Sequence, residues 1–434
     1  MTVFFINPPR INPEVSSFEL PLGVVTLLSS MEQQHPEIAC QVVDLQLYPE
    51  LDPVTLICDD QPVICMTILT YNKNIVYGLC EKLRAAHPNA VIILGGPHAT
   101  LQKDKVFLEC DAVDYVSIGE GDFALPQLLA QLYSGNSDCS AVPGAIRKDG
   151  MAGPANRRIE DLSVLPSITL GMKHYDMQKV IKRNTYVSYI ASRGCPFDCI
   201  YCSSSNIWGH LITFVDSQTV CNDLQWLADQ GVKYINFRDD IFTLKKKWLA
   251  PVLEKLKQLH IIWGCETRAD CVDRNTLTQM KDAGCELIRF GVETFNQHTL
   301  DALNKRTDVE QVKQSIRDAL AVGITEIRLS MMLGLPGEAD ADVENTLKTC
   351  GEFPGVFFKF FSLYPTIGTE LYNHLEKYGV AMLASEALIG HSQIHTTTMD
   401  NQRINYWIEE AHRQFHDPEE DFHRDFSIIF NRGL

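Results

Sequence analysis

Short apolar runs alternate with amphipathic stretches along the first 150 residues. Three of the stretches have the length and apolar spacing of helices: Leu22–Met31, Lys73–Ala86 and Phe123–Tyr133. Five apolar runs have the length of strands: Val3–Ile6, Gln41–Leu45, Val63–Ile68, Val91–Leu94 and Tyr115–Ile118. Strands that alternate with helices predict a parallel, doubly wound α/β sheet over residues 1–150. Such sheets bind ligands at the carboxyl ends of their strands.

The same alternation returns after a stretch without periodicity. Residues 134–184 are rich in Gly, Pro, Ser and Asn, which predicts a domain junction there and a linker over residues 151–184. Six further strand-like runs follow within residues 185–375: Tyr186–Ser192, Tyr234–Arg238, Ile261–Arg268, Leu287–Glu293, Glu326–Leu333 and Phe357–Tyr364. Six strands with helices between them favour a partial (β/α)6 TIM-like barrel over a closed eight-stranded one. We expect residues 376–434 to form a small C-terminal region close to the substrate.

Composition and charge narrow the class of protein. The chain has 434 residues, 38 Lys plus Arg and 55 Asp plus Glu, so its formal net charge is −17. This acidity disfavours nucleic acid and membrane surfaces as partners. No segment approaches the about 20 apolar residues of a membrane span, and the start of the chain does not resemble a signal peptide. Fourteen Cys without an export signal indicate a reducing compartment, so we expect a cytoplasmic protein.

The strongest chemical signal is a group of three cysteines directly after a predicted strand. Cys195, Cys199 and Cys202 have the spacing C-x3-C-x2-C. The same spacing is also that of one face of a buried helix, but Gly194 and Pro196 favour a loop. Thiolates at this density suit a soft metal. The other eleven Cys are scattered, and we expect them to be small buried apolar residues.

Two kinds of metal site compete for these thiols. A structural zinc site usually takes four ligands, and His210 is the nearest candidate for a fourth. Three thiolates can instead hold a [4Fe–4S] cluster and leave one iron open to bind a cofactor. We favour the cluster because no fourth Cys or His follows at the spacing of a zinc finger.

The cysteine motif resembles that of the radical S-adenosylmethionine (SAM) superfamily, including the aromatic Tyr201 before the last Cys. The resemblance implies that the open iron binds the amino and carboxylate groups of SAM. It also implies reductive cleavage of SAM to a 5′-deoxyadenosyl radical, with electrons from an external donor such as flavodoxin or ferredoxin.

Polar residues at the ends of the later predicted strands agree with this resemblance. Asp239 and Asp240 stand where the family holds the SAM amine, although the family commonly has Gly-Gly-Glu there, and Glu293 stands where the family binds the ribose. Arg268 and Ser330 end the third and fifth strands, so we expect them at the same site. The loop 332–338 resembles the one near the adenine. Each residue also has a structural alternative: a helix N-cap for the aspartates or Glu293, and an ion pair for Arg268.

Two glycine motifs in the first 150 residues resemble the Rossmann-like B12-binding domain found ahead of radical SAM barrels. Gly95 and Gly96 end the fourth strand, and Gly119 and Glu120 follow the fifth. The resemblance implies that these residues bind cobalamin, whereas a plain tight turn is the alternative for a lone Gly-Gly. The loop 7–13 contains no His, so we expect no protein His on cobalt. We expect His98, in the Gly-Gly loop, to be a hydrogen-bonding residue.

Three functions compete on these grounds. The leading hypothesis is a cobalamin-dependent radical SAM methyltransferase that methylates an unactivated carbon of a small molecule or peptide. The alternative is a radical SAM dehydratase, cyclase, epimerase or ring-contraction enzyme of the same architecture, with or without bound cobalamin. The third is a non-catalytic iron–sulfur or zinc regulator, which the series of strand-end residues disfavours. No catalytic residue is assigned; the expected substrate lining is Tyr71 and residues 357–398, including Tyr364, His391 and His395.

Overall fold

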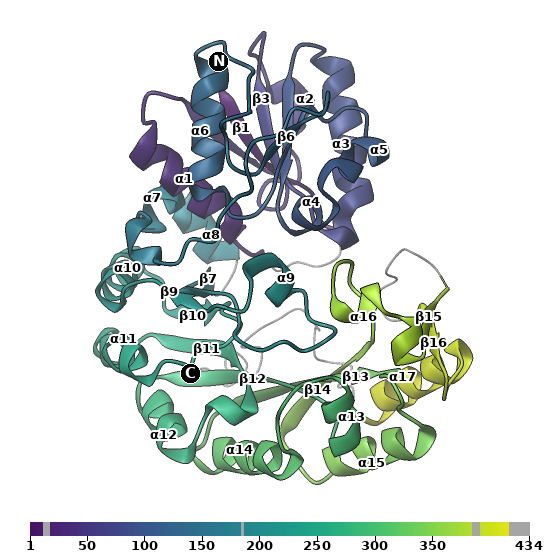
Figure 1. The fold of residues 1–434 in the computed structure, drawn as a ribbon. Coiled ribbons are helices and arrows are strands. Elements are labelled where there is room, and N and C mark those ends of the chain that lie inside the picture. Colours follow the sequence, from purple (N-terminus) through teal and green to yellow (C-terminus); the bar gives the residue numbers. More distant parts are fainter. Residues whose placement is uncertain (12–17, 184–185, 384–390, 416–434) are drawn as a thin grey trace. The chain divides into compact units, whose positions relative to one another are not determined.

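The structure is a computed structural model that describes residues 1–11, 18–183, 186–383 and 391–415. The chain folds into two compact units (Figure 1). The first comprises Met1–Ser188 with Asp229–Gly231, and the second comprises Tyr189–Ala228 with Val232–Leu434. Each unit is α/β in class, as the sequence predicts, whereas the domain limits at residues 150, 184 and 375 stay predictions.

The first unit is built on a six-stranded sheet in the order β2-β1-β3-β4-β5-β6. The first five strands run parallel: β1 Val3–Asn7, β2 Cys40–Asp44, β3 Val63–Thr67, β4 Val91–Gly95 and β5 Tyr115–Ser117. Strand β6, Ala145–Arg147, pairs antiparallel with β5. The connecting helices are α1 Leu22–Gln34, α2 Pro53–Leu56, α3 Lys73–Ala86, α4 Pro97–Gln102, α5 Val106–Glu109 and α6 Gly121–Tyr133. The predicted doubly wound sheet is therefore confirmed.

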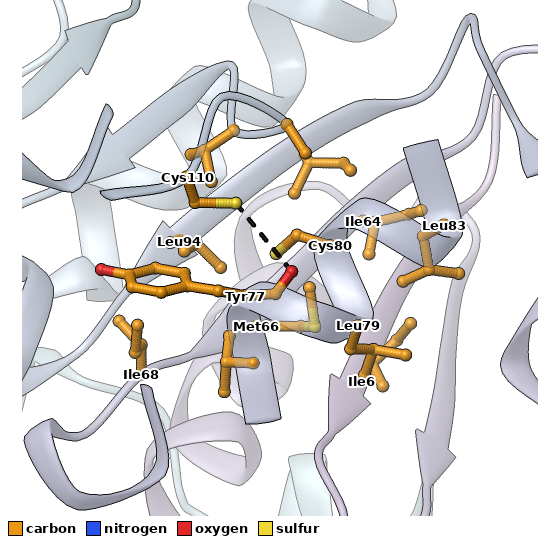
Figure 2. Packing of buried hydrophobic residues seen from close by; sticks show 14 of the residues in the cluster. Ile6, Ile64, Met66, Ile68, Tyr77, Leu79, Cys80, Leu83, Leu94 and Cys110 are labelled. Atoms are coloured by element: carbon orange, nitrogen blue, oxygen red, sulfur yellow. Dashed lines mark hydrogen bonds between the residues drawn. The ribbon is translucent and has the colours of Figure 1, made fainter. Parts of the chain in front are cut away.

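The core of the first unit lies between the sheet and its helices. Ile64 and Leu94 are fully buried, and Cys80 and Leu83 of α3 pack in the same cluster (Figure 2). Because helices cover both faces of a parallel sheet, its strands read as continuous apolar runs. Cys80 is a small buried apolar residue, as expected for the scattered cysteines; most of them are buried and all are free thiols, but Cys58 is exposed.

The predicted linker over residues 151–184 is largely structured. It contains α7, Thr169–Met172, and α8, Met177–Arg183. Helix α7 packs directly on α1: the Gly171 amide donates to Ser29 Oγ at 2.8 Å, and Ser29 Oγ donates to the Ile168 carbonyl at 3.2 Å. Helix α7 is too short for its apolar residues to form a periodic pattern, which is why the sequence predicts a linker here.

The second unit is built on another six-stranded sheet, in the order β14-β13-β12-β11-β10-β7, whose last strand β7 begins in the first unit. Its strands are β7 Val187–Tyr189, β10 Tyr234–Phe237, β11 Ile262–Thr267, β12 Cys285–Glu293, β13 Glu326–Leu333 and β14 Val356–Ser362, with parallel pairing from β10 to β14. The predicted strand 186–192 is split, because β8, Ser192–Arg193, pairs with β9, Thr213–Phe214, in a separate two-stranded sheet. Six strands with helices between them agree with the predicted partial barrel.

The two faces of this sheet differ in chemistry. Phe290 of β12 and Leu329 of β13 are fully buried on the face that packs against helices, whereas Arg289 and Arg328 alternate with them on the other face and are only partly buried. We call this second face the inner face. The connecting helices are α9 Ser204–Trp208, α10 Ser217–Asp229, α11 Lys246–Leu259, α12 Arg274–Asp282, α13 Gln297–Ala302, α14 Val309–Ala321 and α15 Asp340–Cys350.

The C-terminal elements of the described chain pack beside β14. They are α16 Glu370–Asn373, the antiparallel pair β15 Val380–Met382 and β16 Ile394–Thr396, and α17 Asn401–Phe415. The Phe415 ring of α17 lies 5.3 Å from that of Phe358, and Trp407 Nε1 donates to Asp340 at 2.7 Å. Among the residues described, no helix combines the length and apolarity that crossing a bilayer requires.

Candidate active site

The carboxyl ends of β10 to β13 bring together most of the residues predicted to bind SAM. Asp239 and Asp240 follow β10, Arg268 follows β11, Glu293 ends β12, and Ser330 lies within β13 on the inner face. Because the strands are parallel, these residues lie at one edge of the sheet, where barrel enzymes carry their active sites.

The three cysteines lie in a loop between β8 and α9, so the alternative of a buried helix face is wrong. Gly194 makes the turn into this loop with φ +90°, and a Cβ there would lie 2.3 Å from the Leu211 carbonyl oxygen. The amide of Cys202 donates to the Cys199 carbonyl at 3.1 Å, which curls the loop back on itself. Position 194 therefore requires glycine, because any side chain there would collide with the backbone.

The thiols of this loop are free, half-buried and close enough to interact electrostatically. Burial, together with the nearby charges of Asp240, Cys199 and Cys195, raises the pKa of Cys202 to about 11. Burial likewise raises the pKa of Cys195. Without a metal, the Cys195 and Cys202 thiols therefore keep their protons at neutral pH, and binding a metal would release them.

The donor set fits an iron–sulfur cluster, in which each thiolate binds a different iron, better than a site for a single ion. Within the described ranges, no three His, Cys, Asp or Glu side chains are arranged to coordinate a single ion. His210, the nearest candidate for a fourth ligand, is exposed. Three neighbouring free thiols on a glycine-turned loop match a cluster with one open iron better than a four-ligand zinc site.

Arg268, directly after β11, contacts the cysteine loop. Its guanidinium lies 3.7 Å from the centre of the Phe197 ring, donates to Asp270 at 2.9 and 2.7 Å, and lies 3.9 Å from Cys199 Sγ. It also donates to the Lys305 carbonyl at 2.7 Å. The ion pair that the sequence offered as an alternative role for Arg268 is therefore present, while its contact with SAM stays a prediction.

Glu293 connects β12 to the cysteine loop through a buried network. Glu293 Oε1 accepts from Lys305 Nζ at 2.6 Å and from Tyr201 Oη at 3.0 Å. Its φ of +71° is unusual for a residue with a side chain, and such strain persists where surrounding contacts enforce it. Lys305 was not predicted from the sequence, because a lysine after a short helix carries no recognisable signal.

The neighbouring aspartates after β10 have different environments. Asp239 is buried, and its Oδ1 accepts from the Ala191 amide at 3.1 Å and from Ser192 Oγ at 2.5 Å, just before the cysteine loop. Burial raises the pKa of Asp239 to about 7. Asp240 is exposed and accepts from Ser204 Oγ at 2.6 Å. The two aspartates therefore accept from residues in or beside the cysteine loop, and they do not act as the helix N-cap that the sequence offered as the alternative.

The loop after β13 is closed by the carboxyl group of Glu338. Its Oε2 accepts from the amides of Gly334 and Leu335 at 2.8 and 3.2 Å, while Oε1 is buried without a partner. Burial raises the pKa of Glu338 to about 8. This loop is the one that resembles the adenine loop of the family.

In the first unit, the Gly-Gly motif lies at the carboxyl end of β4. Gly96 has φ +93°, and a Cβ there would lie 2.7 Å from Thr67 Cγ2, so the turn requires glycine. A Cβ on Gly95 would meet its nearest neighbour, the Ser117 carbonyl oxygen, at 3.6 Å. The backbone at Gly95 is thus half-exposed at the edge where such sheets bind ligands, which suits cobalamin.

The second glycine motif of this unit, Gly119 and Glu120, contacts residues 156–159, which follow the last strand of the sheet. Glu120 forms an ion pair with Arg158 and accepts from the Ile159 amide at 2.6 Å. Asn156 Nδ2 donates to the Glu120 carbonyl at 2.8 Å and packs against Gly119. The contacts predicted between these residues and cobalamin stay predictions.

His98 is a hydrogen-bonding residue, as expected, but it lies in α4 rather than in a loop. It is buried, with Nδ1 3.1 Å from Thr70 Oγ1 and Nε2 3.4 Å from Glu109 Oε2. Burial lowers its pKa, so the ring is neutral at pH 7.

The expected substrate lining is only partly placed. Tyr71 is exposed in the first unit, Tyr364 is half-buried after β14, and His391 and His395 are exposed. Residues 384–390 of the predicted lining, and residues 12–13 of the loop without His, lie outside the described residues.

Comparison with known families matches both units. Residues 13–129 match the B12 binding domain, and residues 189–350 match the Radical SAM superfamily. Together these segments cover well over half of the chain.

Named relatives extend over most of the chain. An uncharacterized methyltransferase from Pyrococcus horikoshii is 25% identical over 86% of this chain and 83% of its own length. An anaerobic magnesium-protoporphyrin IX monomethyl ester cyclase from Rubrivivax gelatinosus is 29% identical, and the match covers 61% of this chain but 49% of the cyclase.

The fold is also that of a solved structure. The radical S-adenosylmethionine methyltransferase TsrM from Kitasatospora setae, with cobalamin and a [4Fe–4S] cluster bound, superposes with a TM-score of 0.73 at 16% identity. The match covers 96% of this chain and 82% of that one.

Proposed function

Because the chain belongs to the radical SAM superfamily, in the branch that carries a B12-binding domain, we propose that it is a cobalamin-dependent radical SAM methyltransferase that methylates an unactivated carbon. The observation that carries the proposal is the loop of three free thiols at the same sheet edge as Asp240, Arg268 and Glu293. A methyltransferase among the relatives supports the reaction type.

We assign the [4Fe–4S] cluster to Cys195, Cys199 and Cys202. When bound, the cluster and SAM supply the 5′-deoxyadenosyl radical, and cobalamin supplies the methyl group. The loop is held for this task by Arg268 stacked on Phe197 and by Tyr201 bonded to Glu293.

We assign the carboxylates around the loop to different parts of SAM. Asp240 is accessible, so it is the group we assign to the SAM ammonium, whereas buried Asp239 holds the backbone ahead of the loop. Glu293 Oε1 already accepts from Lys305 and Tyr201, so we assign the other carboxylate oxygen of Glu293 to the ribose diol. Ser330 lies in the row of the inner face next to Gly291 and contributes a hydroxyl there.

The second candidate is a radical SAM cyclase, dehydratase, epimerase or ring-contraction enzyme. The similarity to a magnesium-protoporphyrin cyclase favours cyclisation among these reactions. A non-catalytic regulator does not account for the acidic and basic residues at the ends of the three successive strands β10, β11 and β12. Either enzyme would use an external electron donor such as flavodoxin or ferredoxin, act in the cytoplasm, and take a small molecule or peptide as substrate.

The test is anaerobic purification followed by reconstitution and reaction with SAM. We expect about four iron and four sulfide per chain, one corrinoid, and 5′-deoxyadenosine on reduction. The triple variant of Cys195, Cys199 and Cys202 to Ala should form none, while C58A, at an exposed cysteine, serves as the matched control. SAM cleavage without bound corrinoid would favour the second candidate, and retained cleavage in the triple variant would refute the cluster assignment.

A further inference from the structure

The segment that follows α13 ends this helix with a backbone turn and contacts the cysteine loop. We call this segment the 303–306 turn. The Asn304 amide donates to the Asp301 carbonyl at 3.0 Å, and the Lys305 amide donates to the Leu300 carbonyl at 3.0 Å. Asn304 has φ +53°, which places it in the left-handed region. Two such bonds around a left-handed residue form a Schellman motif, which usually carries glycine at that position and sometimes asparagine.

The contacts of the Asn304 side chain give a reason for asparagine, rather than glycine, at the left-handed position. Asn304 Nδ2 donates to the Asp198 carbonyl in the cysteine loop at 3.1 Å. Asn304 Oδ1 accepts from Arg306 Nε at 3.1 Å, and Arg306 also pairs with the Asp198 carboxylate at 3.0 Å. Glycine would adopt the same backbone without strain but could make neither bond of the Asn304 side chain.

The neighbours of Asn304 in the turn contact the same part of the loop. The Leu303 carbonyl accepts from the Ile200 amide at 3.1 Å. Lys305 Nζ donates to Tyr201 Oη at 3.3 Å. All four residues of the 303–306 turn therefore contact residues 198–201, on both sides of the second cysteine of the motif.

These contacts differ in how much they contribute to the fold of the loop. The ion pair between Arg306 and Asp198 is exposed to solvent, so it contributes little. The Asn304 bond is partly buried and pairs a backbone carbonyl of the loop. The Ile200 carbonyl accepts from the Leu371 amide at 2.9 Å, so both backbone groups of Ile200 are paired with other parts of the second unit. Protein contacts alone can therefore order the loop.

We propose that the 303–306 turn holds the cysteine loop in its fold before a metal binds, and that Asn304 is the positioning residue in this contact. The thiols then stand on a backbone that is already ordered. A zinc finger differs, because there the metal itself drives folding. The inference rests on the proposed function only because that function assigns the loop to a cluster.

The experiment is hydrogen exchange of the metal-free full chain, read by mass spectrometry on a peptide that contains residues 197–202. In the wild type, the Ile200 and Cys202 amides should exchange slowly, because both donate to backbone carbonyls. N304G should speed exchange of this peptide about fivefold, the effect expected from loss of one hydrogen bond. N304D tolerates the left-handed backbone but has no amide donor, so it should speed exchange as N304G does.

Two controls separate this contact from general stability. H260G changes another left-handed residue to glycine, at the exposed end of α11 with φ +51°, and should leave exchange of the loop peptide unchanged. A peptide from the buried strand β12 reports opening of the whole second unit. In N304G the β12 peptide should exchange as in the wild type, because Asn304 acts on the loop alone.

Iron release from the reconstituted chain gives a second readout. N304G and N304D should lose iron to a chelator about fivefold faster than the wild type, because release requires the loop to open, and H260G should match the wild type. Three results would overturn the inference. They are a wild-type loop peptide that exchanges like an unfolded chain, wild-type exchange in both Asn304 variants, and equal acceleration of the loop and β12 peptides in N304G.

Failure of the proposed function has a separate readout. A reconstituted wild-type chain without the absorption of a [4Fe–4S] cluster contradicts the function. Exchange of the metal-free chain does not depend on that result, so it decides the inference about the 303–306 turn in either case.

Discussion

The Glu338 carboxyl group is buried in the loop after β13, where one oxygen accepts two backbone hydrogen bonds and the other has no partner. Burial raises its pKa from 4.5 to about 8. Between pH 4.5 and about 8, Glu338 therefore keeps its proton in the folded chain but is ionised in the unfolded chain. Stability is full below that ordinary value and falls as the pH rises toward about 8, because ionising the buried group is costly.

This predicts a pH-dependent gain in stability for E338Q. Glutamine keeps an oxygen acceptor for the Gly334 and Leu335 amides but has no proton to lose. Between pH 5 and pH 8.5 the free energy of unfolding of the variant should rise relative to the wild type by on the order of a few kcal/mol. Urea unfolding at both pH values measures the difference, and parallel pH profiles would contradict the assignment of the proton.

A second residue-scale prediction concerns Asp239, which holds the backbone ahead of the cysteine loop. D239A leaves the Ala191 amide and Ser192 hydroxyl without their acceptor, a cost of about 1–3 kcal/mol. The reconstituted variant should therefore lose iron faster during gel filtration than the wild type. D239N keeps an acceptor oxygen and should retain iron; equal retention by D239A would remove Asp239 from this positioning role.

Single residues show where prediction from the sequence stops. The motif singled out Asp239 and Asp240 together, but the different burial of the two depends on strands that are distant in the sequence. Lys305 could not be found, because its role arises only when the chain after α13 returns to Glu293. The three cysteines were identified because their spacing is local and needs no tertiary contact.

At the scale of elements, the contact between α7 and α1 depends on one glycine. A Cβ on Gly171 would lie 1.9 Å from the Val25 carbonyl oxygen, so G171A must displace α7 from α1. We expect a loss of about 1–3 kcal/mol in the free energy of unfolding. G78A in α3 is the control, because a Cβ there meets nothing within 4 Å and alanine favours the helix. A neutral G171A would contradict the close packing.

Another element-scale prediction tests the carboxyl end of β4 as a cobalamin contact. At Gly95 an added Cβ finds only ordinary contacts within the protein, so G95V should fold with a melting temperature close to that of the wild type. The valine would nevertheless cover backbone that a ligand approaches. Corrinoid content, read from the visible absorption of the purified protein, should fall; a full complement of corrinoid would exclude this site.

Long amphipathic elements were predicted well, and short ones were not. The helix over Lys73–Ala86 matches α3 at both ends, because its apolar face is set by periodic residues. Strand β6 and helices α7 and α8 were missed, since three to seven residues carry too little pattern. The break between β7 and β8 was also missed. It arises because the Ala191 amide donates to Asp239, 48 residues further along the chain, rather than to a neighbouring strand, and the local sequence does not reveal this contact.

At the scale of the whole molecule, the chain joins a B12-binding domain to a radical SAM domain, and each unit presents the carboxyl edge of a parallel sheet. The formal net charge of −17 disfavours nucleic acid and membrane surfaces as partners, as we expect from the sequence. The proposed enzyme thus combines a cobalamin domain with radical chemistry at a thiol loop.

The most direct test is the electron paramagnetic resonance spectrum of the reduced, reconstituted chain, recorded with and without SAM. We expect a [4Fe–4S] signal that shifts when SAM is added, because one iron has no protein ligand and is free to bind it. A cluster signal that SAM leaves unchanged would mean that SAM does not bind an iron of the cluster. That result would contradict the assignment of an open iron to the loop of Cys195, Cys199 and Cys202.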